Sequence, residues 1–99
     1  MIYKACDNTI LITSLTDGNT PIDDATITAT LTDTNGLTIA TASLDYSLGE
    51  YSAVFTAQDT AHLCIGKTYF VVISITVGSR IVDTRREQHI AAWRDYGLA

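Results

Sequence analysis

The chain has 99 residues, a length that suits one domain and is too short for two ordinary ones. Hydrophobic residues make up 46% of it, which argues against intrinsic disorder, and no apolar run approaches the roughly 18–20 residues that a membrane-spanning helix needs. The net charge is −5. Because an acidic protein repels phosphate backbones, we expect no nucleic acid among its partners, and we expect no membrane.

The charge is spread unevenly along the chain. Residues 1–66 hold eight acidic residues and one base, whereas residues 67–99 hold five bases and three acidic residues. The opposed ends could attract neighbouring copies head to tail. Chance and a need for solubility would produce the same asymmetry, so both interpretations stay open.

Strand signals begin near the amino terminus. Residues 8–15 predict a first strand with Ile10 and Ile12 on one face, and a turn-rich stretch at residues 16–21 follows. In residues 25–33, four apolar residues alternate with four threonines. This period of two predicts a strand with its apolar side chains towards a core and its threonines towards water.

The middle of the chain continues the pattern. Asn35 and Gly36 tolerate the positive φ angles of a tight hairpin turn, so we expect a return strand at residues 37–44. Residues 46–49 predict a further turn, and residues 50–56 predict a short strand.

The longest predicted strand follows a polar crossover at residues 57–66. It covers residues 67–77, and Phe70 and Val72 add apolar groups to its second face, so we expect it to be central in the fold. A last strand is predicted at residues 80–87. Six or seven short strands at regular spacing are typical of an antiparallel β-sandwich.

One short motif resembles a known family. Residues 63–69 read Leu-Cys-Ile-Gly-Lys-Thr-Tyr, which resembles the corner before strand F in immunoglobulin-like and fibronectin type III domains. In those domains the tyrosine hydroxyl bonds back to upstream backbone. Val71 stands where antibody domains have cysteine, and the third strand lacks their tryptophan. The resemblance implies an all-β, antiparallel immunoglobulin-like sandwich of six to seven strands at residues 1–84, with a short tail or helix at residues 85–99.

A broader layout covers residues 16–77. It is similar to short β-sandwich modules of bacterial surface proteins and to small structural proteins of tailed bacteriophages. The matching segments are Asp17-Gly18, Pro21-Ile22, Ala25-Thr26-Ile27-Thr28, Asn35-Gly36, Gly49-Glu50-Tyr51 and Gly66-Lys67-Thr68-Tyr69. The resemblance implies a structural role, such as a head decoration, neck or head–tail connection subunit.

The residues that could carry catalysis or bind a metal form no recognisable motif in the sequence. His62 lies three residues after Asp59 and two before Cys64, and an acidic turn at residues 17–24 could hold calcium weakly. Ordinary solvated loops explain both groups. No glycine-rich phosphate loop and no nucleophile elbow is present. We therefore expect no enzyme, no cofactor and no metal.

Two further features bear on where the protein is made. Cys6 and Cys64 are too few for a disulfide framework; they could form one bridge, but we expect free, buried thiols. Residues 1–7 lack the basic region and apolar stretch of a signal peptide. The expectation is a protein made in the host cytoplasm and assembled into a virion.

The segment from residue 85 onwards is expected to leave the strand pattern. Ile90, Trp93 and Gly97 fall at helical spacing, and tryptophan, tyrosine and arginine are enriched at interface hot spots. Either this segment docks on a neighbouring subunit, or it packs back so that Trp93 closes its own core. The predicted partner-binding residues are Arg85, Arg86, Ile90, Trp93, Arg94 and Tyr96.

The sequence thus favours a non-enzymatic structural or assembly protein, most concretely a small phage virion component. Its partners would be proteins, namely other copies of itself and virion proteins. The alternative is a ligand- or carbohydrate-binding module. In that case exposed Tyr3, Tyr46 or Tyr51 would form an aromatic platform for a sugar ring, although Tyr51 is expected to face the core.

Overall fold

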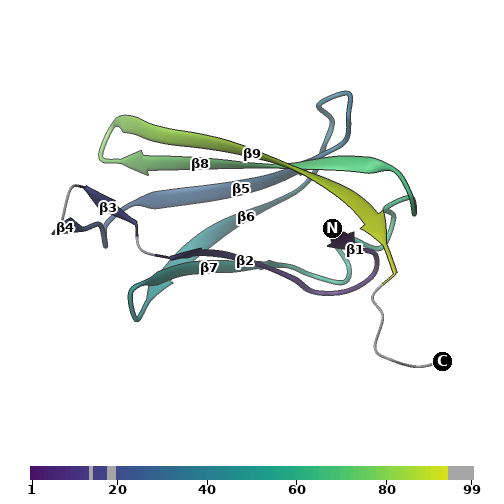
Figure 1. Ribbon diagram of the computed structural model, residues 1–99, viewed down its shortest axis with the longest axis horizontal. Coiled ribbons are helices and arrows are strands. Elements are labelled where there is room, and N and C mark those ends of the chain that lie inside the picture. Colours follow the sequence, from purple (N-terminus) through teal and green to yellow (C-terminus); the bar gives the residue numbers. More distant parts are fainter. Residues whose placement is uncertain (14, 18–19, 94–99) are drawn as a thin grey trace.

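A computed structural model of the protein describes residues 1–13, 15–17 and 20–93. Within these ranges the regular structure is β-strand throughout and no helix occurs, which confirms the all-β prediction (Figure 1). Within the same ranges, no helix has the length and hydropathy needed to cross a lipid bilayer. The strands are β1 (Ile2–Tyr3), β2 (Asn8–Thr13), β3 (Thr16–Asp17), β4 (Thr20–Pro21), β5 (Thr26–Thr32), β6 (Thr38–Ser47), β7 (Glu50–Phe55), β8 (Thr68–Val77) and β9 (Arg80–Ala92).

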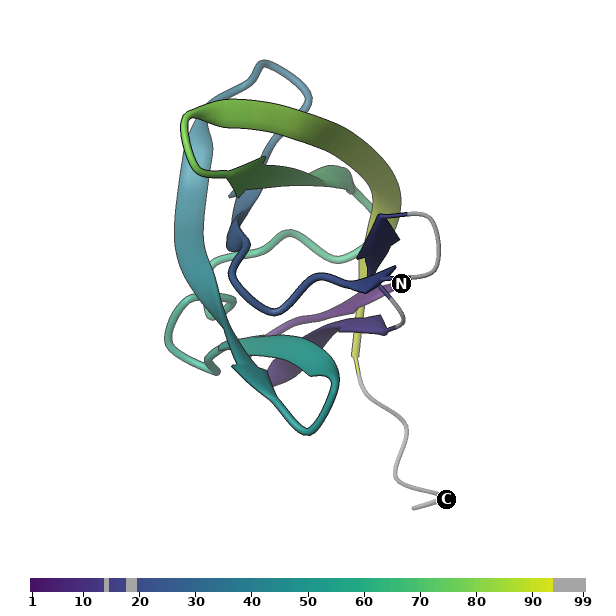
Figure 2. The same ribbon diagram turned by 90° about the vertical axis from the view of Figure 1, so that its left-hand side faces the viewer.

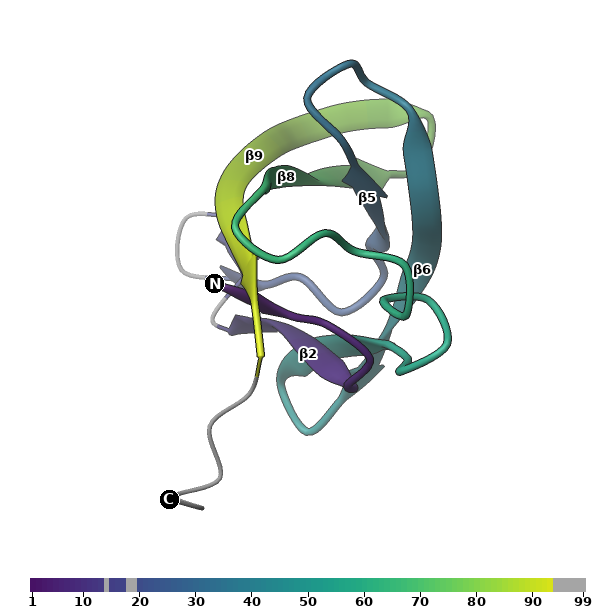
Figure 3. The same ribbon diagram turned by 90° about the vertical axis from the view of Figure 1, so that its right-hand side faces the viewer.

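Seven of the strands form one sheet in the order β1-β9-β8-β5-β6-β7-β2, and β3 pairs with β4 separately. All neighbours in the sheet are antiparallel except β1 and β9. The long strand β6 pairs with β5 along its first part and with β7 at its end. The sheet therefore curls round, and β2 comes to face β1 and β9 across the interior (Figures 2 and 3).

The core follows from the alternation of side chains along the strands. In β5, Ile27, Ala29 and Leu31 are buried, while the threonines between them are only partly covered. In β8, the side chains from Tyr69 to Ile75 are buried at every second position, and β8 lies between β5 and β9 as predicted for a central strand. Burial of each isoleucine, leucine or valine among them stabilises the fold by about 1.5–3 kcal/mol.

Two hairpin turns show why these residues stand where they do. The Asp33 carboxylate accepts hydrogen bonds from the backbone N–H groups of Asn35 (2.8 Å) and Leu37 (2.9 Å), which closes the predicted turn between β5 and β6. Between β6 and β7 the turn has only two residues, Leu48 and Gly49, with φ angles of +50° and +83°. The turn is shorter than the predicted residues 46–49 because β6 continues pairing to its last residue.

The predicted tyrosine corner is present before β8. The hydroxyl oxygen of Tyr69 accepts a hydrogen bond from the backbone N–H of Cys64 at 2.7 Å, and Tyr69 is 5% exposed. A second polar anchor is Thr60, which is fully buried; its hydroxyl bonds to the backbone N–H and carbonyl of Cys6. Together they attach the crossover between β7 and β8 to the sheet and to the amino-terminal segment.

β9 runs across the predicted boundary at residue 85. β9 continues in register with β8 up to the pair Thr68 and Ile90, so residues 85–92 are strand and neither tail nor helix. The helical spacing of Ile90 and Trp93 is coincidental, because backbone pairing with a long central strand outweighs such a weak pattern. The remaining part of the predicted tail, residues 94–99, lies outside the described residues.

Two smaller expectations also need correction. No disulfide joins Cys6 to Cys64, but the thiols are not buried as expected: Cys6 is only half-buried, and Cys64 is exposed because the crossover that carries it runs over the surface. The sequence also contained no signal for β1. Its two residues are a strand only because they pair in parallel with Ala91 and Ala92 at the other end of the chain.

Candidate functional site

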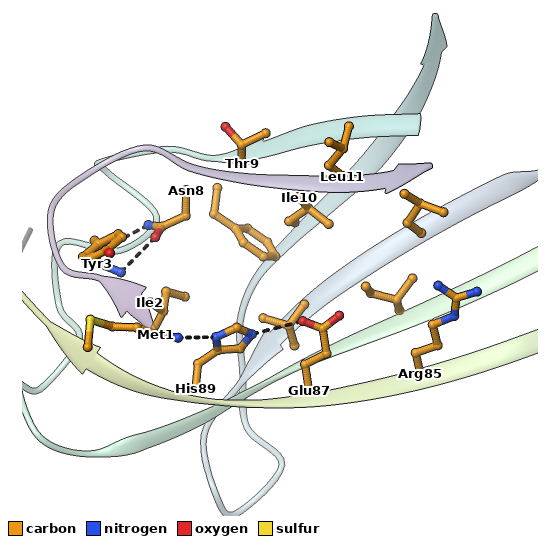
Figure 4. Close-up of a pocket in the computed structure, with 14 residues that line it drawn as sticks. Met1, Ile2, Tyr3, Asn8, Thr9, Ile10, Leu11, Arg85, Glu87 and His89 are labelled. Carbon is orange, nitrogen blue, oxygen red and sulfur yellow. Dashed lines mark hydrogen bonds and ion pairs between the residues drawn. The ribbon is translucent and has the colours of Figure 1, made fainter. Parts of the chain in front are cut away.

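A groove of about 520 Å³ lies where the two ends of the sheet meet. β2 forms one wall and β9 the other, and β1 closes one end (Figure 4). Its floor is apolar and belongs to the core. The apolar side chains that line it from the core are Ile2, Ile10, Ile12, Phe55, Val71 and Ile73.

The β9 wall of the groove is charged. Arg85, Glu87 and His89 point from β9 into the groove (Figure 4), and they stand beside buried residues of β8. Inward positions of a strand are normally apolar. They are charged here because, among the described residues, no strand lies over this part of β9, so that water reaches these side chains.

The charges on this wall are paired with one another. The Arg85 guanidinium bonds to the Asp83 carboxylate at 2.9 Å, and His89 Nε2 lies 3.3 Å from the Glu87 carboxylate. The amino-terminal nitrogen of Met1 lies 2.9 Å from Nδ1 of His89. The hydrogen bond from Arg85 holds the pKa of the Asp83 carboxyl below its usual value, although both groups lie at the surface.

The backbone of the groove walls is open along most of its length. β2 is the last strand of the sheet, and β9 is covered by β1 only at Ala91 and Ala92. In the described part of the chain, residues 8–13 and residues 80–90 therefore each have one unpaired strand edge. At the β1 end, the Asn8 side chain joins the walls by accepting a hydrogen bond from the Tyr3 N–H (2.8 Å) and donating one to the Tyr3 carbonyl (2.9 Å).

The structure divides the predicted partner-binding residues between the two faces of β9. Arg85 lines the groove, whereas Arg86 lies on the opposite face with its guanidinium 3.7 Å from the centre of the Phe70 ring. Ile90, 51% exposed, shares that opposite face by the alternation of the strand. These residues therefore form no single patch.

Trp93 lies just beyond the end of β9. It is 63% exposed and 5.3 Å from the ammonium group of Lys4, so the alternative in which it closes the core is wrong. Ala91, at 1% exposure, is the last core residue of β9. Arg94 and Tyr96 lie outside the described residues.

The other candidate groups of the sequence do not converge. His62 is exposed, and the Asp59 carboxylate accepts a hydrogen bond from the Thr56 N–H at 3.0 Å, which places it in a local turn. No three His, Cys, Asp or Glu side chains of the described residues lie close enough together to share a metal ion.

The three tyrosines of the alternative prediction form no platform. Tyr51 is 1% exposed, as expected, and its hydroxyl donates to the Ile22 carbonyl (2.8 Å) and accepts from the Ala25 N–H (3.1 Å). Tyr46 is tilted by 58° against the Tyr51 ring. The backbone N–H of Tyr3 donates a hydrogen bond to Asn8, which lies at the end of β2 away from Tyr51.

Comparisons with known proteins found a similar fold but no matching family. No family model matches the chain, and no curated protein matches it. The structure is similar to the crystal structure of a putative glycoside hydrolase from Bacteroides vulgatus ATCC 8482, with a TM-score of 0.59 and 16% sequence identity. The match covers 95% of this chain but 16% of the other protein. The likeness therefore concerns the fold alone, in a part of a much longer chain.

The groove itself was missed by the sequence analysis. A signal for it was present in residues 83–89, where Asp83, Arg85, Glu87 and His89 occupy every second position. Charged residues at this period indicate a strand whose inward face lacks a covering strand.

Proposed function

We propose that the chain is a non-enzymatic, immunoglobulin-like assembly module that binds another protein subunit. The observation that carries the proposal is the groove, because an apolar floor between two open strand edges offers the contacts that a polypeptide makes. A small ligand would not use the unpaired backbone groups of both walls.

Two features support the immunoglobulin-like assignment. The corner bond between Tyr69 and Cys64 has the role that this bond has in immunoglobulin-like domains. The sheet also divides at β6 into two halves that enclose one core, which is the arrangement of a sandwich.

The surroundings of the groove favour binding over catalysis. Retaining and inverting glycosidases use a pair of carboxyl groups that flank the scissile bond. Of the described residues that line the groove, Glu87 alone carries a carboxylate, and it is paired with His89. The similar Bacteroides protein therefore supports no hydrolase activity for this chain.

The most concrete setting we propose is the virion of a tailed phage, where the chain would be a head decoration, neck or head–tail connection subunit. This step rests on the similarity of residues 16–77 to small phage structural proteins. The partners would then be further copies of the chain and other virion proteins, with assembly in the host cytoplasm.

The experiment that tests the proposal is the solution mass of the full chain, alone and mixed with phage capsid and tail proteins, by size-exclusion chromatography with light scattering at modest salt. We expect a closed multimer or a stable mixed complex. A chain that stays monomeric in every mixture, and that is missing from purified virions by mass spectrometry, would refute the proposal. Hydrolysis of a glycoside that Glu87→Gln abolishes would refute its non-enzymatic part.

A further inference from the structure

We propose that the groove binds an extended segment of a partner protein as an added β-strand, which continues the line of β1 between β9 and β2. The inference rests on the proposed function and names the form of the partner: an extended peptide segment with apolar side chains at alternate positions. β1, the backbone of β9 and the charges of the β9 wall all support it.

The first support is β1, which already occupies one end of this position. Ile2 pairs with Ala91 and Tyr3 pairs with Ala92, in parallel. A strand that continues this register would place its inward residues beside His89, Glu87 and Arg85 in turn. Because paired strands match residue for residue, residues 85–90 of β9 would accommodate about six residues of a partner.

The second support is the direction of the backbone groups of β9. Ala91 donates its N–H to the Lys67 carbonyl and accepts from the Gly66 N–H, so its backbone faces β8. The Ala92 carbonyl instead accepts from the Lys4 N–H on the β1 side. Because these directions alternate along a strand, Gln88 and Arg86 direct their backbone groups towards the groove, where no described strand pairs with them.

The third support is the chemistry of the side chains. The floor of the groove is apolar, and the Arg85 and Glu87 side chains that overhang it are 46% and 54% exposed, so both are free to swing into water. Arg85 is paired with the Asp83 carboxylate, and Glu87 lies beside the His89 imidazole. A partner with inward apolar side chains and outward polar ones therefore fits the groove best.

The test uses a synthetic peptide, acetylated Lys-Thr-Val-Thr-Ile-Thr-Val-Lys amide, whose apolar residues alternate. The control peptide has the same composition with its three apolar residues consecutive. Amide hydrogen exchange of the full chain is measured by NMR with each peptide. With the alternating peptide at about ten times its Kd, exchange at Gln88 and Arg86 should slow about tenfold, and the control should leave it unchanged.

Two variants separate the groove from the rest of β9. Glu87→Trp fills the groove and should abolish the protection. Gln88→Trp places the same ring on the opposite face of the strand and should retain protection at Arg86. Both wild-type positions are exposed, so both variants should fold, and their melting temperatures check this.

A tethered version covers weak binding, because a short link raises the effective concentration to the millimolar range. The alternating segment is fused before Met1 so that its apolar residues fall two, four and six positions before Ile2. Insertion of one residue shifts them to the wrong face and is the control. If neither the free nor the tethered segment protects Gln88 and Arg86, the inference is wrong.

The result of this test can be distinguished from the result of the assembly test of the proposed function. A chain that assembles in solution or in virions while the groove protects no strand would keep the proposed function and overturn the inference. A chain that never assembles but accepts the alternating segment would do the reverse. Protection of the same amides by self-association would support the inference, with a second copy as the strand donor.

Discussion

Replacement of Tyr69 by phenylalanine tests the tyrosine corner and with it the reasoning on the crossover. The hydroxyl is the only group removed, and in the structure it accepts the Cys64 N–H at 2.7 Å. Its loss leaves this N–H without that partner in a part-buried place. An unsatisfied buried donor costs about 1–3 kcal/mol, and partial access of water to Cys64 places the expected loss at the lower end, about 1–2 kcal/mol.

Urea denaturation followed by far-ultraviolet circular dichroism measures this loss. The midpoint should fall while the slope with denaturant stays unchanged, because the substitution alters stability and not the surface exposed on unfolding. A loss of 1 kcal/mol corresponds to a decrease in melting temperature of about 4–8 °C for a domain of this size. Amide exchange at Cys64 should also become faster in the variant.

The matched control is Tyr46→Phe. Tyr46 is 43% exposed, and among the described residues its hydroxyl makes no hydrogen bond, so the same chemical change should cost almost nothing. Tyr51→Phe provides the opposite comparison, because its hydroxyl joins two backbone groups, and its cost should equal or exceed that of Tyr69→Phe. If Tyr69→Phe is as stable as Tyr46→Phe, the corner bond contributes nothing and the argument fails.

Four further predictions concern other parts of the fold. Ile73→Ala should lower the free energy of unfolding by about 2–5 kcal/mol because it opens a cavity at a side chain that is 3% exposed; a smaller loss in urea denaturation would contradict its place in the core. Leu48→Asn should raise the melting temperature, because Leu48 is 98% exposed at φ +50° and asparagine tolerates this conformation better. A decrease would mean that the leucine side chain makes a stabilising contact in solution. Cys64 should react with a maleimide in the folded protein, as intact-mass spectrometry would detect, and an unreactive thiol would contradict its exposure. Arg85→Gln should raise the pKa of Asp83 towards its usual value in a carboxyl-carbon NMR titration, because it removes the hydrogen bond that favours the ionised form; an unchanged pKa would show that this bond does not persist in solution.

Much of the fold could be predicted from the sequence because its strongest signals are local. The alternation in residues 25–33 depends only on the two-residue period of a strand, and it placed the side chains of β5 on the correct faces. The turn at Asn35 and Gly36 depends on the positive φ of Gly36 and on the Asp33 side chain two residues before Asn35, and both are properties of neighbouring residues. The corner tyrosine was recognisable because its bond spans only five residues.

The candidate site depends on contacts between distant parts of the chain, which local patterns do not contain. β1 has two residues and becomes a strand by pairing with residues 91 and 92. Residues 85–92 lack the apolar alternation of a buried strand, and they extend β9 because β8 offers a long edge to pair with.

The amino-acid sequence by itself determined that the described part of the chain is all-β, which side chains of β5 and β8 face the core, and where Tyr69 closes the crossover. Only the tertiary structure decided that β2 and β9 meet across an apolar groove with their edges open, and that Arg85 and Arg86 lie on opposite faces of β9. The physical reason is that alternation along a strand is set by its own backbone, whereas an open edge exists only in relation to strands elsewhere in the chain.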